Sequence, residues 1–250
     1  MPKLKEKEAL CTLEDKADQV KKAKRLSLFR NPSTYCLGAI GLLFLTYAVS
    51  DVAIGLPIRQ KIAVTLIILA SLYLMVIASP NRSNDSYTRG IYLCMIVCYV
   101  YFVISSTLLD TSLGRGDLKS IADPALRREH YERWFVNLVP LHTVKTIYID
   151  ALKNGYLSLG YVVFNAIGNL LILAPLSILI PAVSKKLSKP YFLLPILLAS
   201  TLAIELLQYA FMRGSCDVDD VIFNFVGAVA VWGLAQIPLF KKALQKIMFL

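Results

Sequence analysis

No charged residue interrupts the stretch from Asn154 to Ser184, whose sequence is NGYLSLGYVVFNAIGNLLILAPLSILIPAVS. A helix needs about 20 mainly apolar residues to cross the hydrocarbon core of a membrane, and this stretch exceeds that length. Comparable runs cover Asn31–Ser50, Ile62–Asn81, Gly90–Leu109, Pro190–Met212 (which holds a single charge, Glu205) and Val221–Phe240. The sequence therefore predicts an all-α, polytopic membrane helix bundle with about six transmembrane helices.

The composition excludes several other classes of protein. Apolar residues make up 56% of the chain, charged residues make up 18%, and the mean hydropathy is +0.59. A soluble domain carries about 25% charged residues, so a soluble enzyme, a disordered chain and a secreted disulfide scaffold are excluded. A β-barrel is excluded because its strands are short and alternate in polarity. The cysteines show no spacing that predicts a disulfide framework.

The distribution of charge predicts the orientation of the chain. Lysine and arginine concentrate before the first span, and if both termini are cytoplasmic the whole net charge of +10 falls on the cytoplasmic side. Because basic residues that flank a span are retained on that side, we expect an N-in/C-in topology. The excess of positive charge is then explained by the orientation of the chain in the membrane. We therefore expect no nucleic-acid partner. The basic N-terminal segment is too long for a cleavable signal peptide and no cleavage site follows it.

The chain divides into five predicted regions. The first two spans form a hairpin through Gly55 and Pro57 and contain few polar residues, so we expect them only to complete the bundle. Two amphipathic helices are predicted on the outer leaflet, one that starts at Pro124 and breaks at Pro140, and one that starts at Val144. The regions are 1–30 (a cytoplasmic basic amphipathic helix), 31–113 (transmembrane helices one to three), 114–157 (an extracellular, interfacial loop), 158–240 (transmembrane helices four to six) and 241–250 (a cytoplasmic tail).

Polar residues inside the last three spans fall at one depth, in the outer half of the membrane. Such residues are costly in hydrocarbon and usually functional. We expect Glu205 to be protonated or paired with Arg213, the nearest cation. One hypothesis is a polar pocket open to the outer face, and the alternative is a set of hydrogen bonds that join the helices. The residues are Asn165 and Asn169 on the fourth span, Glu205 and Gln208 on the fifth, and Asp220 and Asn224 on the sixth.

A metal site is not expected, and neither is a cofactor. Asp217, Asp219 and Asp220 could suit Mg²⁺ or Ca²⁺, but Asp219 is predicted to point away from the face that the other two share. Asp217 is predicted to cap the sixth helix. The histidines, His130 and His142, lack ligand spacing.

Four segments resemble, in order, the conserved pattern of the VanZ-like membrane protein family. The resemblance covers about residues 91–232 and leaves the first two spans outside. Ser177 stands where that family often has glycine or alanine. The segments are Arg133-Trp-Phe-Val-Asn137-Leu-Val-Pro140, Asn165-Ala-Ile-Gly-Asn169, Glu205-Leu-Leu-Gln208-Tyr209, and Arg213 followed by Asp217-Val-Asp-Asp220-Val-Ile-Phe-Asn224-Phe-Val-Gly227.

The resemblance implies a multi-pass protein of the bacterial cytoplasmic membrane, and its founding member is associated with resistance to teicoplanin. It also adds Arg133 and Asn137 to the candidates. The implied partners are membrane lipids, and a lipid-linked cell-wall precursor or an anionic lipid headgroup. The full set of candidate binding residues is Arg133, Asn137, Asn165, Asn169, Glu205, Gln208, Arg213, Asp217, Asp220 and Asn224.

Three functions stay open at this point. The chain could be an envelope factor that binds or modifies a cell-envelope component and lowers glycopeptide susceptibility. It could be a membrane-embedded enzyme acting on a lipid-linked headgroup, with Glu205 or Asp220 as the catalytic general base. It could also transport a lipid or small molecule, although the inner halves of spans four to six offer little polar surface beyond Ser177 and Gln236.

Overall fold

The computed structural model describes residues 32–78, 85–109, 118–150, 153–155 and 158–248. The chain divides into two compact units, Met1–Thr46 and Tyr47–Leu250. The described part of the first unit is the beginning of helix α2, in which the Thr46 hydroxyl donates to the Leu42 carbonyl. All the interactions discussed below lie within the second unit.

Within the described residues, six helices are long and apolar enough to cross a membrane, as the sequence predicts. Their exposed faces are apolar, with Leu66 and Leu206 among the exposed side chains, which suits contact with lipid tails. The fold is therefore that of an all-α, multi-pass membrane protein. The α-helices are α2 (Pro32–Ile54), α3 (Ile58–Ala78), α4 (Asp85–Ile104), α5 (Pro124–Phe135), α7 (Leu159–Leu171), α8 (Ala174–Val183), α9 (Pro190–Phe211), α10 (Val218–Gln236) and α11 (Pro238–Met248).

Short elements complete the fold. The third span continues from α4 into a π-helical segment, η1 (Ser105–Leu109). A 3-10 turn, η2 (Leu118–Ser120), precedes α5, and a second π-helical segment, η3 (Val144–Asp150), lies where the second amphipathic helix of the loop is predicted. α4 starts at Asp85, before the predicted start of the third span at Gly90, because hydropathy marks the apolar part of a helix and not its polar first turn.

The fourth span is broken into α7 and α8. Pro175 lies in the first turn of α8. In a continuous helix its ring would clash with the carbonyl of the residue four positions earlier, so α7 ends at Leu171. The break exposes the carbonyl of Ile172, and the buried Tyr99 hydroxyl of α4 donates to it at 2.8 Å. Tyr99 thus supplies a hydrogen bond that the fourth span cannot make for itself in an apolar environment.

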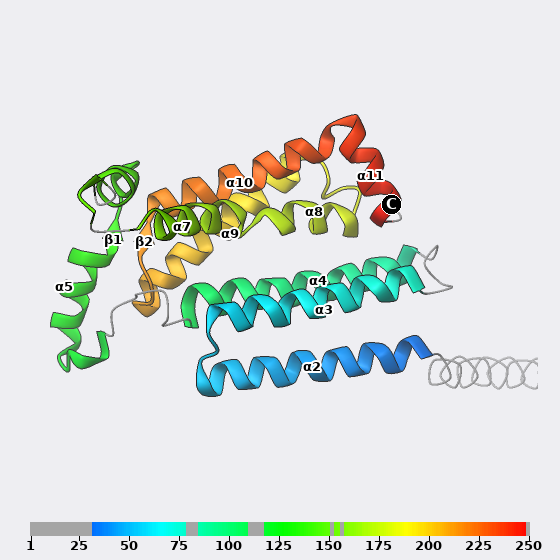
Figure 1. The fold of residues 1–250 in the computed structure, drawn as a ribbon, viewed down its shortest axis with the longest axis horizontal. Coiled ribbons are helices and arrows are strands. Elements are labelled where there is room, and N and C mark those ends of the chain that lie inside the picture. The colour runs from blue at the N-terminus through cyan, green and yellow to red at the C-terminus, as the bar shows by residue number, and fades with distance from the viewer. Residues whose placement is uncertain (1–31, 79–84, 110–117, 151–152, 156–157, 249–250) are drawn as a thin grey trace, which may run out of the picture. The chain divides into compact units, whose positions relative to one another are not determined.

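The apolar core lies where α4, α8, α9 and α10 meet, and Figure 1 shows α7, α9 and α10 running side by side. Phe102, Leu173, Leu193 and Ala228 are among its buried residues. The closest approach is at Gly227 of α10, where an added Cβ atom would lie 1.8 Å from the Leu170 carbonyl oxygen of α7. Glycine is therefore required for these two helix backbones to touch.

The long loop between the third and fourth spans pairs through a short strand with the connection between α9 and α10. α5 begins at Pro124, as predicted, and the side chain of Asp123 caps it by accepting from the Ala125 N–H. The helix ends at Phe135 and not at Pro140, because the next residues leave it to form strand β1 (Val136–Asn137). β1 pairs in parallel with β2 (Cys216–Asp217), an interaction that pairs Asn137 with Asp217.

Candidate functional site

Asp217 is the centre of a polar cluster between α9, α10 and the loop. It caps α10, as the sequence predicts, by accepting from the Asp219 N–H at 2.8 Å. Its carboxylate also accepts from the Asn137 side-chain amide at 2.9 Å and from the Thr143 hydroxyl. Its own N–H donates to a carboxylate oxygen of the buried Glu205 at 2.8 Å. Two candidate residues from sequence, Asn137 and Glu205, are therefore brought together through Asp217.

The prediction that Asp219 points away from Asp217 is wrong. Asp219 is 1% exposed, and its carboxylate accepts from the N–H groups of Leu141, Thr143 and Val144. Helical spacing does not apply to this pair because Asp217, as the cap, has extended backbone angles of φ −131° and ψ 124°. Charge-assisted hydrogen bonds of this kind contribute about 1.5–3 kcal/mol each, and here they hold a turn in which Leu141 has a φ of 63°.

The fourth and sixth spans are joined by one pair of candidate residues. The Asn169 side-chain amide of α7 donates to the Asp220 carboxylate of α10. Asn165, one turn earlier on α7, is half-buried, and no hydrogen bond within the described chain joins it to this cluster. The two asparagines that share a face in sequence therefore differ in their contacts.

Gln208 and Asn224 each leave one buried acceptor atom without a donor. Gln208 donates to the Thr107 carbonyl of η1 at 3.3 Å, and Asn224 donates to the Thr201 hydroxyl at 3.3 Å. Among the residues that the structure describes, the side-chain oxygens Gln208 Oε1 and Asn224 Oδ1 accept no hydrogen bond. Buried polar atoms in this state are rare and costly.

The two candidate arginines lie apart from these hydrogen bonds. Arg133 is exposed and donates to Glu129 on its own helix at 2.9 Å. Arg213 is half-buried, and the ion pairs of the described chain do not include it. Among the described residues, the expected ion pair between Glu205 and Arg213 is therefore not formed, and the Asp217 N–H donates to the Glu205 carboxylate.

α5 is held on α9 by contacts that the sequence does not reveal. The Arg128 guanidinium lies 4.1 Å from the centre of the Tyr209 ring and donates to Glu132, which also accepts from the Tyr209 hydroxyl. These hydrogen bonds raise the pKa of Arg128, chiefly through Glu132, and lower the pKa of Glu132, chiefly through Tyr209. The buried Tyr131 hydroxyl donates to the Gln208 carbonyl at 3.0 Å.

The pKa of the Cys216 thiol depends on the carboxylates of the cluster around Asp217. Burial, followed by the carboxylates of Glu205, Asp217 and Asp220, raises the pKa of its thiol above the ordinary value. Each of these causes disfavours the negatively charged thiolate. Within the described residues, no group of three or more His, Cys, Asp or Glu side chains is arranged to hold a metal ion.

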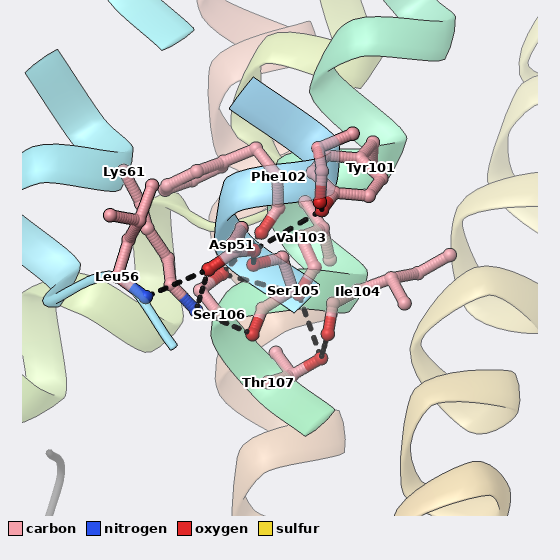
Figure 2. Close-up of polar contacts among 11 residues, drawn as sticks. Asp51, Leu56, Lys61, Tyr101, Phe102, Val103, Ile104, Ser105, Ser106 and Thr107 are labelled. Atoms are coloured by element: carbon pink, nitrogen blue, oxygen red, sulfur yellow. Dashed lines mark hydrogen bonds and ion pairs between the residues drawn. The ribbon is translucent and has the colours of Figure 1, made fainter. Parts of the chain in front are cut away.

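The first two spans contribute to a second polar cluster, which their few polar residues did not predict. That these spans only complete the bundle stays a prediction. The fully buried carboxylate of Asp51 and ammonium of Lys61 lie 3.2 Å apart. Asp51 also accepts from the Leu56 N–H at 3.2 Å, from the Tyr101 hydroxyl at 3.2 Å and from the Ser105 hydroxyl. Figure 2 shows these groups converging on the Asp51 carboxylate. The signal in the sequence is the pair of opposite charges, Asp51 and Lys61, on either side of the Gly55–Pro57 turn.

The two polar clusters share the π-helical segment η1. Lys61 donates to the Ser105 carbonyl at 3.1 Å, and Gln208 donates to the Thr107 carbonyl. The hairpin of α2 and α3 is thereby connected, through the backbone of η1, to a residue of the candidate site.

One comparison with known proteins assigns the chain to a family. The family model described as VanZ/LLP1 matches residues 90–241, which include η1, the loop and the last three spans. No curated protein and no solved structure is similar enough to the chain to be reported as a relative. The family match covers more than half of the chain, and it includes every residue of the cluster around Asp217. This chain therefore belongs to the VanZ/LLP1 family.

Proposed function

We propose that this protein recognises the polar headgroup of a lipid-linked cell-envelope component and thereby lowers susceptibility to glycopeptides such as teicoplanin. The observation that supports the proposal is the pair of buried acceptors, Gln208 Oε1 and Asn224 Oδ1, for which the described residues provide no donor. Together with the neighbouring carboxylates, they favour a ligand that offers hydroxyl, amide or ammonium groups. Sugars and peptides linked to a lipid offer such donors.

Arg213 supports a ligand that also carries phosphate. Its guanidinium has five N–H donors in a geometry that suits phosphate oxygens, and it makes no ion pair within the described chain. The carboxylates of Glu205, Asp217 and Asp219 oppose a ligand that is purely anionic. A phosphate-linked headgroup with hydrogen-bond donors fits both features better than an anionic lipid alone.

Recognition is better supported than catalysis or transport. A general base must reach the proton of its substrate. The hydrogen bonds of the candidate bases are structural ones within the protein, since Glu205 accepts from the Asp217 N–H and Asp220 accepts from Asn169. On the other half of the fourth span, the Ser177 hydroxyl donates to the Ala174 carbonyl of its own helix. No contact in the described chain favours a polar path between the two ends of the bundle.

We infer that both termini are cytoplasmic and that the protein lies in the bacterial cytoplasmic membrane. The lysines of the α8–α9 turn and of α11 support this orientation, because basic residues are retained on the cytoplasmic side. The cluster around Asp217 would then face outward, where glycopeptides encounter cell-wall precursors.

Two substitutions test the function. In a susceptible bacterium that expresses the protein, Glu205→Gln and Asn224→Leu are each expected to remove most of the protection against teicoplanin, because they delete a charge and a buried acceptor at the proposed site. The measurement is the minimal inhibitory concentration, together with the amount of protein in the membrane. Glu129→Gln is the matched control, since Glu129 is exposed on α5, and it should retain protection. Full protection by both site variants would contradict the proposal.

Cys216 tests the orientation and the charge of the cluster in one experiment. In a chain whose other cysteines are replaced by alanine, a membrane-impermeant maleimide added to intact cells is expected to alkylate Cys216. Glu205→Gln removes a cause of the raised thiol pKa, so the thiolate fraction and the alkylation rate below that pKa should increase. Glu132→Gln, which is not among the causes, should leave the rate unchanged. Alkylation only after the membrane is permeabilised would contradict the orientation.

A further inference from the structure

α11 is a separate amphipathic helix that begins directly where the sixth span ends. α10 ends at Gln236, Ile237 caps it with extended backbone angles, and Pro238 starts α11. Figure 1 shows α11 turning away from the axis of α10. Helical structure thus continues into the segment that the sequence predicts as a cytoplasmic tail, and its position next to a membrane span requires an explanation.

The two faces of α11 differ sharply in polarity. At the helical spacing of about 3.6 residues per turn, one face carries apolar side chains and the opposite face carries lysines and a glutamine. Leu239 is 75% exposed and Phe240 is 50% exposed, so the apolar face is not covered by the rest of the chain that the structure describes. The apolar residues are Leu239, Phe240, Ala243 and Leu244, and the polar ones are Lys241, Lys242, Gln245 and Lys246.

The same end of the bundle carries further positive charge. Successive spans alternate in direction, so the turn from α8 to α9 and the start of α11 lie on the same side of the membrane. That turn contributes Lys185, Lys186 and Lys189. Lys186 lies 4.9 Å from the centre of the Phe192 ring, and the neighbouring Tyr191 is 62% exposed. Aromatic and basic residues together are typical of a membrane–water interface.

We infer that α11 lies flat in the headgroup region of the adjacent leaflet and binds anionic phospholipid through its lysines. The acyl chains beside the sixth span are the nearest medium that can cover the exposed apolar face, and the lysines are complementary to lipid phosphate. A second copy of the chain would instead bring two sets of lysines together, which opposes association through this end. The inference is independent of the function proposed for the cluster around Asp217.

The position of α11 is tested by spin labels on its two faces. Full-length protein in which the native cysteines are replaced by alanine receives a nitroxide at Ala243→Cys and is reconstituted in vesicles of phosphatidylcholine and phosphatidylglycerol. Gln245→Cys in the same background is the matched control on the polar face. The label at position 243 should collide several-fold more often with oxygen than with a water-soluble nickel chelate, and the label at 245 should show the reverse. Equal accessibility at both positions, or shielding of position 243 from both reagents by a protein partner, would overturn the inference.

The preference for anionic lipid is tested by neutralising the lysines. Each lysine near an anionic surface contributes about a fivefold increase in binding. The protein is expected to select spin-labelled phosphatidylglycerol over phosphatidylcholine, and the triple variant Lys241→Gln/Lys242→Gln/Lys246→Gln should lose most of this selectivity. The corresponding triple arginine variant should retain it, as should Lys145→Gln/Lys153→Gln, which removes charges from the long loop. Unchanged selectivity in the triple glutamine variant would overturn the assignment of anionic lipid.

Discussion

Gly227→Ala is expected to destabilise the protein by about 3 kcal/mol or more, and to lower the midpoint of thermal unfolding by about 10 °C. The added Cβ atom would lie 1.8 Å from the Leu170 carbonyl oxygen, which is part of a helix backbone and cannot rotate away. α7 and α10 would have to separate, and Asn169, which donates to Asp220 of α10, is the residue next to Leu170. The measurement is thermal unfolding of the purified protein in detergent.

Gly233→Ala is the matched control on the same helix. Nothing lies within 4 Å of the Cβ position at Gly233, so the substitution adds no contact there. Alanine is favoured over glycine in a helix by roughly 0.5–1 kcal/mol, and this variant should be as stable as the original chain or slightly more stable. Equal unfolding temperatures for the two variants would show that α7 and α10 do not touch at Gly227.

Lys61→Met is expected to destabilise the protein by about 3–5 kcal/mol, because it leaves the buried carboxylate of Asp51 without its counter-ion. Asp51→Asn should have a comparable effect, since it leaves the Lys61 ammonium buried and uncompensated. The double variant Asp51→Asn/Lys61→Met removes both charges and should be less destabilised than either single variant. Unfolding of the four proteins in denaturant gives the coupling energy of the pair.

Arg59→Met is the control for the loss of a positive charge in the same hairpin. Arg59 is exposed, and surface substitutions change stability by about 0.5 kcal/mol or less. If Lys61→Met were as mild as Arg59→Met, Lys61 would not be a buried partner of Asp51.

The ion pair between Asp51 and Lys61 connects the first two spans to the part of the chain that matches the family model. Asp51 and Lys61 lie outside the matched residues 90–241, yet Lys61 donates to the carbonyl of Ser105, and Gln208 donates to the carbonyl of Thr107 in the same π-helical segment. A π-helical segment leaves backbone groups available for such contacts and often occurs at functional sites. The hairpin therefore contacts the same segment, η1, as Gln208 of the candidate site.

The sequence by itself determined the features that depend on local composition and spacing. Long uncharged runs are sufficient to predict six membrane helices, because the transfer of apolar side chains into hydrocarbon is favourable residue by residue and needs no particular partner in space. Proline and aspartate at helix starts act within one turn, so the start of α5 at Pro124 and the capping of α10 by Asp217 could both be predicted.

Tertiary structure alone decided which polar groups meet. Asp219 binds the N–H groups of Leu141 and Thr143, more than 70 residues away in the chain, and helical spacing predicts the opposite direction for its side chain. The same applies to Glu205, whose carboxylate accepts from the Asp217 N–H and makes no pair with Arg213. A buried charge must find a partner, and the sequence shows that need, but only the packing of the helices and the path of the loop determine which donor comes within 3 Å.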